Sequence, residues 1–225
     1  MTSTVALFDL DGTLCYGRIW EGFLKYYLRR KKRRVWILGF WAMHLPLWLL
    51  GKCKLISEEG YRTKWMEDLG GIFKGASREE GLEAFHWVAD NYIFKSLRSD
   101  VVDILHQHKQ NGHMVVIISA SFSELLEIVG QRLGVPYVIG TKLEVINGSY
   151  TGKIAKPLCF SENKAKLLKD FIYQNGLEID SSSSFAYADS IFDVPLLQLV
   201  GNPVATYPDE NLRQLAEHNG WRRIC

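Results

Sequence analysis

Two carboxylates with a spacing suited to phosphoryl transfer follow the first apolar segment of the chain. Residues Val5 to Phe8 are apolar, and Asp9 and Asp11 come directly after them in the run Asp-Leu-Asp-Gly-Thr. A carboxylate can attack phosphorus and form an acyl phosphate. A second carboxylate two residues on lies on the same side of the chain, so it can protonate the leaving oxygen and later activate water. The spacing therefore indicates a nucleophile at Asp9 and a general acid and base at Asp11.

Further polar residues stand at the ends of other predicted strands or at a helix start. They are Ser119 with Ala120, Lys164, and Asp189 with Ser190 and Asp193. Converging carboxylates repel one another unless a cation lies among them, and a set of oxygen ligands suits Mg²⁺. The hydroxyl of Ser119, the ammonium group of Lys164 and the backbone N–H groups after Ser119 can bind phosphoryl oxygens. The set therefore predicts a magnesium-dependent phosphate site.

The elements that must position these residues alternate between strands and helices. After residue 99, strands are predicted at 113–119, 137–141, 185–189 and 204–207, with helices at 100–110, 124–133, 162–173, 194–199 and from 209 onward. Asn147-Gly148 favours a hairpin turn within 144–150. This alternation predicts an α/β fold with a doubly wound, Rossmann-like parallel sheet, whose polar residues meet at the carboxyl edge of the strands.

The segment between the first strand and this alternating region is predicted to be helical. The apolar pattern from Ile19 to Phe94 is helical, and helix starts are indicated at Ser57 and by a capping box from Ser77 to Glu80. We therefore expect a core formed by residues 1–14 and 99–225. An all-helical cap of residues 15–98 is expected to be inserted after the first strand, where it excludes water and selects the substrate.

Four groups of these residues match, in order, the four motifs of a known family. The groups are Asp9-Leu-Asp-Gly-Thr13, Ser119, Lys164, and Asp189 with Asp193. In this respect the chain resembles the haloacid dehalogenase superfamily of phosphohydrolases over nearly its whole length. The run from Asp189 to Leu197 looks like subfamily IB, the phosphoserine phosphatase-like branch, and phosphatidylglycerophosphatase C is similar there too.

The resemblance implies a role for each matching residue. Asp9 is the nucleophile and a ligand of Mg²⁺, while Asp11 is the general acid and base and binds the metal through its carbonyl. Asp189 completes the metal site, and Ser190 and Asp193 support it. The substrate-binding residues expected from it are Thr13, Arg18, Ser119, Ala120 and Lys164.

Two positions depart from the family pattern. Arg18 stands where phosphoserine phosphatases carry a glutamate that binds the substrate amine, and Ala188 precedes Asp189 where a glycine is more usual. The first departure argues against phosphoserine as the substrate. We expect the second to be tolerated.

A basic and tryptophan-rich segment lies within the predicted cap. Six consecutive cations, residues 29–34, precede sixteen uncharged residues, 35–50, that include Trp36, Trp41 and Trp48. At about 1.5 Å per residue this run is shorter than a bilayer core of about 30 Å, and Pro46 is expected to interrupt it. Two interpretations stay open: the run is the buried centre of the cap, or it lies in the interface of an anionic membrane.

Charge and cysteine content narrow the classes of function. Residues 15–98 contain sixteen Lys or Arg against nine Asp or Glu, so this segment is the basic part of the chain. No motif for stacking bases or reading a DNA groove accompanies the basic run, so we expect no nucleic-acid partner. The four cysteines are scattered, which favours reduced thiols, and no signal peptide is evident. We expect a cytoplasmic protein, in peripheral contact with the inner face of the membrane through residues 29–50 under the second interpretation.

Taken together, the residues predict a Mg²⁺-dependent phosphatase acting on a phosphomonoester, with a lipid-linked or otherwise hydrophobic substrate suited to the cap. A small soluble metabolite such as phosphoserine is the alternative substrate. A non-catalytic phospho-acceptor or lipid-binding module is the alternative class of protein.

Overall fold

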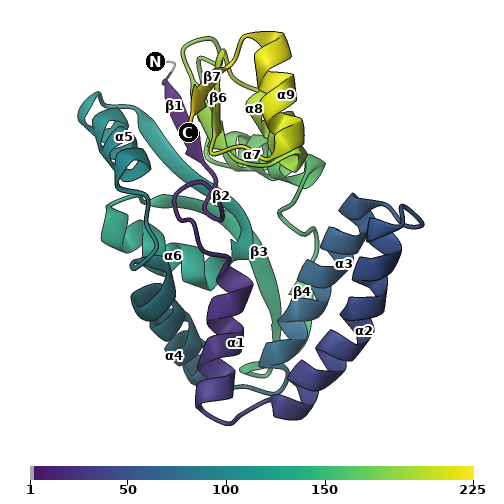
Figure 1. Ribbon diagram of the computed structural model, residues 1–225. Helices are drawn as coiled ribbons and strands as arrows, with labels where there is room; N and C mark the ends of the chain where they lie inside the picture. Colours follow the sequence, from purple (N-terminus) through teal and green to yellow (C-terminus); the bar gives the residue numbers. More distant parts are fainter. Residues whose placement is uncertain (1–2) are drawn as a thin grey trace.

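The chain folds around one mostly parallel sheet. The computed structural model describes residues 3–225. Its strands are β1 (Val5–Phe8), β2 (Met114–Phe122), β3 (Tyr137–Ile146), β4 (Ser149–Ala155), β5 (Phe185–Ala188), β6 (Asn202–Thr206) and β7 (Arg222–Ile224). They form a sheet in the order β4-β3-β2-β1-β5-β6-β7, in which only the β3–β4 pair is antiparallel among the described strands. The predicted doubly wound α/β fold is confirmed (Figure 1).

Helices cover both faces of this sheet because its central strands are apolar on both sides. The core helices are α5 (Ser99–Gln110), α6 (Ser123–Leu133), α7 (Glu162–Gln174), α8 (Val194–Leu197) and α9 (Glu210–Asn219). Along β1, Ala6 and Phe8 pack in the buried cluster that includes α5 and α6, whereas Val5 and Leu7 pack against α7, α8 and α9. A strand buried on both faces in this way is typical of the centre of a parallel sheet.

The segment between β1 and α5 is helical, as the sequence predicts. Its elements are α1 (Ile19–Arg29), α2 (Arg34–Lys52), α3 (Glu58–Leu69), the 3₁₀ helix η1 (Gly70–Phe73), α4 (Arg78–Val88) and the π-helix η2 (Ala89–Ile93). The Ser57 hydroxyl accepts a hydrogen bond at the start of α3, and Ser77 and Glu80 form the predicted capping box of α4. These helices lie beyond the carboxyl edge of β1 (Figure 1).

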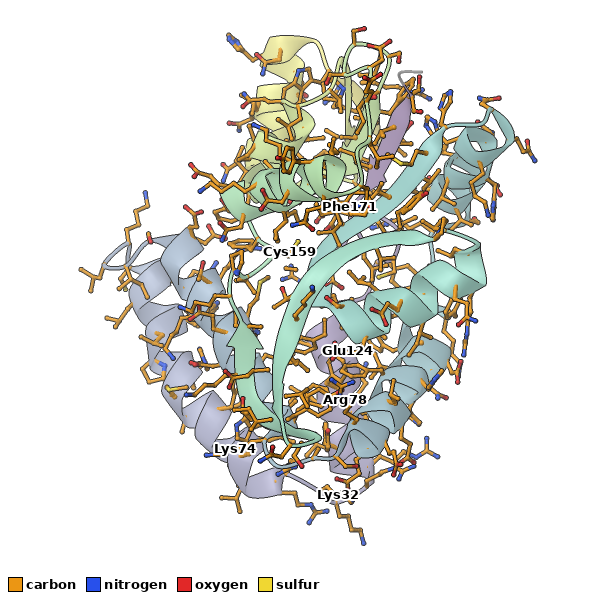
Figure 2. The ribbon with its side chains drawn as sticks, turned by 180° about the vertical axis from the view of Figure 1, so that it is seen from behind. Lys32, Lys74, Arg78, Glu124, Cys159 and Phe171 are labelled. Carbon is orange, nitrogen blue, oxygen red and sulfur yellow. The ribbon has the colours of Figure 1, made fainter. Side chains whose placement is uncertain are left out.

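An aromatic cluster joins this helical segment to the sheet. Phe23 of α1 packs against Phe73, Phe85 and Phe122 at ring-centroid distances of 5.3–5.7 Å, and Tyr150 of β4 contacts Phe73. The β3–β4 hairpin lies between the α2–α3 pair and helices α4 and α6 (Figure 2). One buried cluster therefore crosses the expected boundary between core and cap, and the division at residues 14/15 and 98/99 stays a prediction.

Strands β3 and β7 differ most from the expectation. β3 extends to Ile146 because its second half pairs with β4 through the predicted hairpin, where Asn147 and Gly148 have φ of 50° and 76°. The short edge strand β7 was not predicted, because Arg222 and Arg223 are exposed and give no apolar alternation.

Helix α2 is continuous and largely exposed. Pro46 lies inside it, so the expectation that this proline interrupts the helix is wrong; loss of one backbone hydrogen bond is tolerated here. By length and composition α2 is the one helix among residues 3–225 that could cross a membrane, and 17% of its most apolar window is buried. The interpretation of residues 35–50 as a buried cap centre is therefore wrong.

Candidate active site

The end of β1 places Asp9 beside the only ammonium group that contacts it in the described part of the chain. Lys164, in the first turn of α7, lies 2.6 Å from Asp9 Oδ1 and 2.6 Å from Asp193 Oδ1. All three side chains are buried. Burial opposes the charge of Lys164, but the carboxylates of Asp193 and Asp9 outweigh it and raise its pKa. Lys164 therefore keeps its charge at neutral pH.

Three carboxylates converge at this point. One oxygen each of Asp9, Asp189 and Asp193 lies within 4.8 Å of the others. Burial raises the pKa of Asp9 to about 6 and raises that of Asp189 well above its usual range, and in both cases neighbouring carboxylates add to the rise. A single lysine does not neutralise the negative charge of three carboxylates this close together. Carboxylate oxygens are ligands that suit Mg²⁺. The residues present therefore fit a divalent cation.

Asp11 lies on the turn after Asp9 and points toward the start of α1. Its Oδ1 accepts a hydrogen bond of 2.9 Å from the Ile19 N–H. Burial and the charge of Asp9 raise the pKa of Asp11 to about 7. A carboxyl group with a pKa near neutrality can both give and take a proton, which suits a general acid and base.

Gly12 makes room for Asp189 in this turn. Its φ is +89°, and a Cβ built on it would lie 2.2 Å from Asp189 Oδ2. A side chain here would displace the carboxylate. In the sequence Gly12 appears only as part of the Asp-Leu-Asp-Gly-Thr run, and no signal there points to Asp189 as its neighbour.

Of the other predicted site residues, Thr13 contacts a carboxylate, while Ser119, Ala120 and Ser190 bond to neighbouring residues. The Thr13 hydroxyl donates a hydrogen bond of 3.3 Å to Asp189 Oδ1, and the Ser121 N–H donates one of 3.3 Å to Ser119 Oγ. The Ala120 carbonyl accepts a hydrogen bond from Thr141. Ser190 accepts a hydrogen bond from Phe192 N–H and caps the 3₁₀ helix η3 (Ile191–Asp193). The roles of these residues in binding phosphate or metal stay predictions.

Asp209 is a residue that sequence reasoning missed. Its carboxylate accepts a hydrogen bond of 2.9 Å from Ile191 N–H, and its own N–H donates one of 2.7 Å to the Asp189 carbonyl. Asp209 therefore holds the turn that carries Asp189. The sequence pattern indicates Asp209 only as the N-cap of α9, and Asp209 does cap that helix. Its second role, at the Asp189 turn, could not be recognised from this pattern.

Arg18 and two cysteines lie near the site. The Arg18 side chain is exposed, and its charge lowers the pKa of Asp11 slightly against the larger effect of burial. Burial raises the pKa of the Cys15 thiol, and it raises the pKa of the Cys159 thiol to about 12. Cys159 lies between α7 and the β3–β4 hairpin (Figure 2). Neither thiol is therefore a nucleophile at neutral pH.

Comparisons with known proteins identify the family of the chain. The model of the haloacid dehalogenase-like hydrolase family matches residues 6–198, so the chain belongs to this family. Within the family, the chain is a phosphatase, as its curated relatives indicate. One of them, the phosphoserine phosphatase SerB1 of Mycobacterium tuberculosis, is 29% identical over 97% of this chain and 70% of its own length.

Two solved structures resemble the fold closely. A protein of unknown function from Bordetella pertussis Tohama I is 27% identical with a TM-score of 0.84, and the match covers 100% of this chain and 99% of that one. A phospho-aspartyl intermediate analogue of a phosphoserine phosphatase is 16% identical with a TM-score of 0.67, covering 100% and 94%. At 16% identity, the second likeness shows the fold alone.

Proposed function

We propose that the chain is a Mg²⁺-dependent phosphatase that hydrolyses a phosphomonoester through an aspartyl-phosphate on Asp9. The observation that carries this proposal is the convergence of Asp9, Asp189 and Asp193, two of which, Asp9 and Asp193, also contact the buried Lys164 ammonium group. Asp9, Asp189 and the Asp11 carbonyl would hold the ion, with Asp193 beside them. The bound ion would neutralise charge on the phosphoryl oxygens and on the carboxylates.

Each covalent step has a residue to perform it. An Asp9 oxygen attacks phosphorus, the bond from phosphorus to the ester oxygen breaks, and Asp11 gives that oxygen its proton. Asp11 then takes a proton from water, which attacks phosphorus and releases inorganic phosphate and the Asp9 carboxylate. Lys164, Ser119 and the N–H groups that follow Ser119 bind the phosphoryl oxygens as charge develops.

Turnover of a generic aryl phosphate tests this proposal. Activity is expected to appear on addition of MgCl₂ and to disappear with excess EDTA. Asp189→Ala is expected to raise the Mg²⁺ concentration needed for half-maximal activity. Full turnover of the wild-type protein in excess EDTA would contradict the assigned metal dependence.

We further propose that the substrate carries a hydrophobic group and that residues 29–50 contact an anionic membrane. The exposed side of α2 includes Val35, Leu38 and Leu49, whose side chains are 85%, 71% and 52% exposed. The helix is buried along a narrow stripe formed by Ile37, Phe40 and His44. An exposed apolar surface of this size marks a contact site for a membrane or for another protein.

The charges around α2 favour a lipid surface at that contact site. Six cations precede the apolar part of the helix, Lys52 and Lys54 follow it, and no acidic residue occurs between Glu21 and Glu58. Each cation close to an anionic membrane contributes about 1 kcal/mol. Charge complementarity therefore points to an anionic bilayer, at the inner face of the membrane for a cytoplasmic protein, rather than to a second protein chain.

Vesicle flotation tests the membrane contact. The protein is expected to float with phosphatidylglycerol vesicles at low salt, to float less as salt rises, and to lose binding when Leu38 and Leu49 are both changed to Gln. Leu82→Gln, at an exposed leucine of α4, serves as the matched control. Failure of the wild-type protein to float at low salt, or concentration-dependent dimerisation that hides the same leucines, would refute the membrane proposal and leave the phosphatase proposal standing.

Phosphoserine is a second candidate substrate because a relative at 29% identity is named a phosphoserine phosphatase. Against it, Arg18 places a cation where a substrate ammonium group would need an anion. Comparison of kcat/KM for phosphoserine with that for an alkyl phosphate decides between them.

A further inference from the structure

Three tryptophans from three different helices meet beside the catalytic turn. Trp20 of α1 lies edge-to-face with Trp41 of α2 and Trp65 of α3, at ring-centroid distances of 5.9 and 5.5 Å, and Trp41 and Trp65 are also 5.5 Å apart. We call these three residues the tryptophan wall. Each pair of rings has the geometry of a favourable aromatic contact.

The tryptophan wall is a surface rather than part of the core. Trp41 is 40% exposed, and Trp20 and Trp65 are half-buried. Trp65, which contacts both other rings, is itself held in place because it also packs on Phe40 and His44 at 4.6 and 4.9 Å. A rigid, partly exposed aromatic surface loses little conformational entropy when it binds a ligand.

The backbone connects the wall directly to the catalytic residues. The Ile19 N–H donates to the Asp11 carboxylate, and Trp20 is the next residue of α1. On the opposite side, Arg62 of α3 lies one turn before Trp65 and stacks on Phe192, the neighbour of Asp193, at 5.0 Å. Trp20 therefore directly follows the residue that binds the Asp11 carboxylate, and α3, which carries Trp65, contacts the core next to Asp193.

The other end of the wall continues onto the apolar surface of α2. Leu45 and Trp48 follow Trp41 at helical spacing, and both are more than 40% exposed. Apart from the indole N–H groups, the wall offers no hydrogen-bonding side chain. Such a surface selects an alkyl chain over a polar group.

We propose that Trp20, Trp41 and Trp65 form the binding site for the alkyl chain of the substrate and that Trp20 sets this specificity. This inference rests on the proposed phosphatase function and deepens it. The phosphate lies at Asp9, the ester oxygen lies near Asp11, and the chain extends along the wall toward the exposed side of α2.

Alkyl phosphates of different length test this proposal without any membrane. The measured quantity is the ratio of kcat/KM for dodecyl phosphate to kcat/KM for butyl phosphate, both below the micelle-forming concentration. The wild-type ratio is expected to exceed one. Trp20→Ala is expected to lower that ratio at least about tenfold, and Trp20→Phe is expected to retain part of it.

Trp87→Ala is the matched control. Trp87 is also half-buried in the helical segment, but it packs on Tyr26 at 5.6 Å and belongs to α4. A tryptophan that acts only in packing would lower the melting temperature and leave the ratio unchanged. The ratio is therefore expected to be unchanged in Trp87→Ala.

Calorimetric titration with dodecylphosphonate, which cannot be hydrolysed, separates this inference from the proposed function. If the wild-type protein binds dodecylphosphonate and Trp20→Ala does not, the result supports the alkyl-chain site at the tryptophan wall, even if the protein shows no turnover. An equal ratio for wild-type and Trp20→Ala, or equal phosphonate affinity, would overturn it. If the wild-type protein hydrolyses both phosphates with no preference for the long chain, the proposed alkyl-chain site is wrong and the proposed phosphatase function still stands.

Discussion

At the scale of single residues, Gly12 leaves no space for a side chain between the proposed catalytic turn and Asp189. Gly12→Ala would place a methyl group on the Asp189 carboxylate in a backbone conformation with φ of +89°. A displacement of about 1 Å in such a site costs on the order of 100-fold in rate. We therefore expect kcat/KM for an aryl phosphate to fall about 100-fold.

Gly112→Ala is the control that distinguishes the clash with Asp189 from the strain of an alanine at positive φ. Gly112 has φ of +75° but no atom within 4 Å of a built Cβ. We expect a cost of about 1 kcal/mol in the free energy of unfolding, with activity unchanged. Equal activity of the two variants would show that Gly12 does not position Asp189.

The sequence could predict the proposed catalytic residues better than the residues that support them. Asp9 and Lys164 have chemistry visible in the residue type, and the structure brings them within 2.6 Å. Gly12 and Asp209 act through contacts with the Asp189 turn, which depend on the fold rather than on local pattern. Their parts in the site could not be read from the chain alone.

At the scale of elements, the junction of α5 with the sheet contains a hydrogen-bonded pair of histidines. His108 Nδ1 lies 2.7 Å from His113 Nδ1, and His108 Nε2 lies 2.8 Å from the Tyr187 hydroxyl. Burial, with the neighbouring His113, lowers the pKa of His108 from 6.5 to about 4. Between pH 6.5 and about 4, His108 is therefore neutral in the folded protein, whereas the same residue binds a proton in the unfolded chain.

This pair predicts a loss of stability in mild acid. Between pH 6.5 and 4 the unfolded state binds more protons at His108, so the free energy of unfolding falls as pH falls, by about 1.4 kcal/mol per unit at most. Urea denaturation across this range is expected to give a shallower pH dependence for His108→Gln than for wild type. Identical slopes would mean that His108 does not contribute.

Element types followed well from the sequence, while lengths depended on pairing. The hairpin at Asn147-Gly148 and the capping box at Ser77 carry local chemistry that needs no partner to be recognised. The extension of β3 to Ile146 and the strand β7 depend on a neighbouring strand. The exposure of α2 could not be derived from composition, since an apolar helix suits a core and a membrane equally.

At the scale of the whole molecule, Mg²⁺ is expected to stabilise the fold. The ion would relieve repulsion among Asp9, Asp189 and Asp193, whose oxygens lie within 4.8 Å of one another. A ligand at 100 times its Kd adds about 2.7 kcal/mol to the free energy of unfolding. We expect MgCl₂ to raise Tm in the wild-type protein and to have little effect on Asp189→Ala. An equal rise in both would place the stabilising ion elsewhere.

The most direct test of the central claim is to trap the phosphorylated enzyme during turnover. Borohydride reduction of an aspartyl phosphate leaves homoserine, which peptide mass spectrometry locates. Turnover of an aryl phosphate with Mg²⁺ is expected to give homoserine at position 9 only, and Asp9→Asn is expected to give none and to lose activity by several orders of magnitude. Homoserine at another aspartate, or wild-type turnover in the Asp9→Asn protein, would contradict the mechanism.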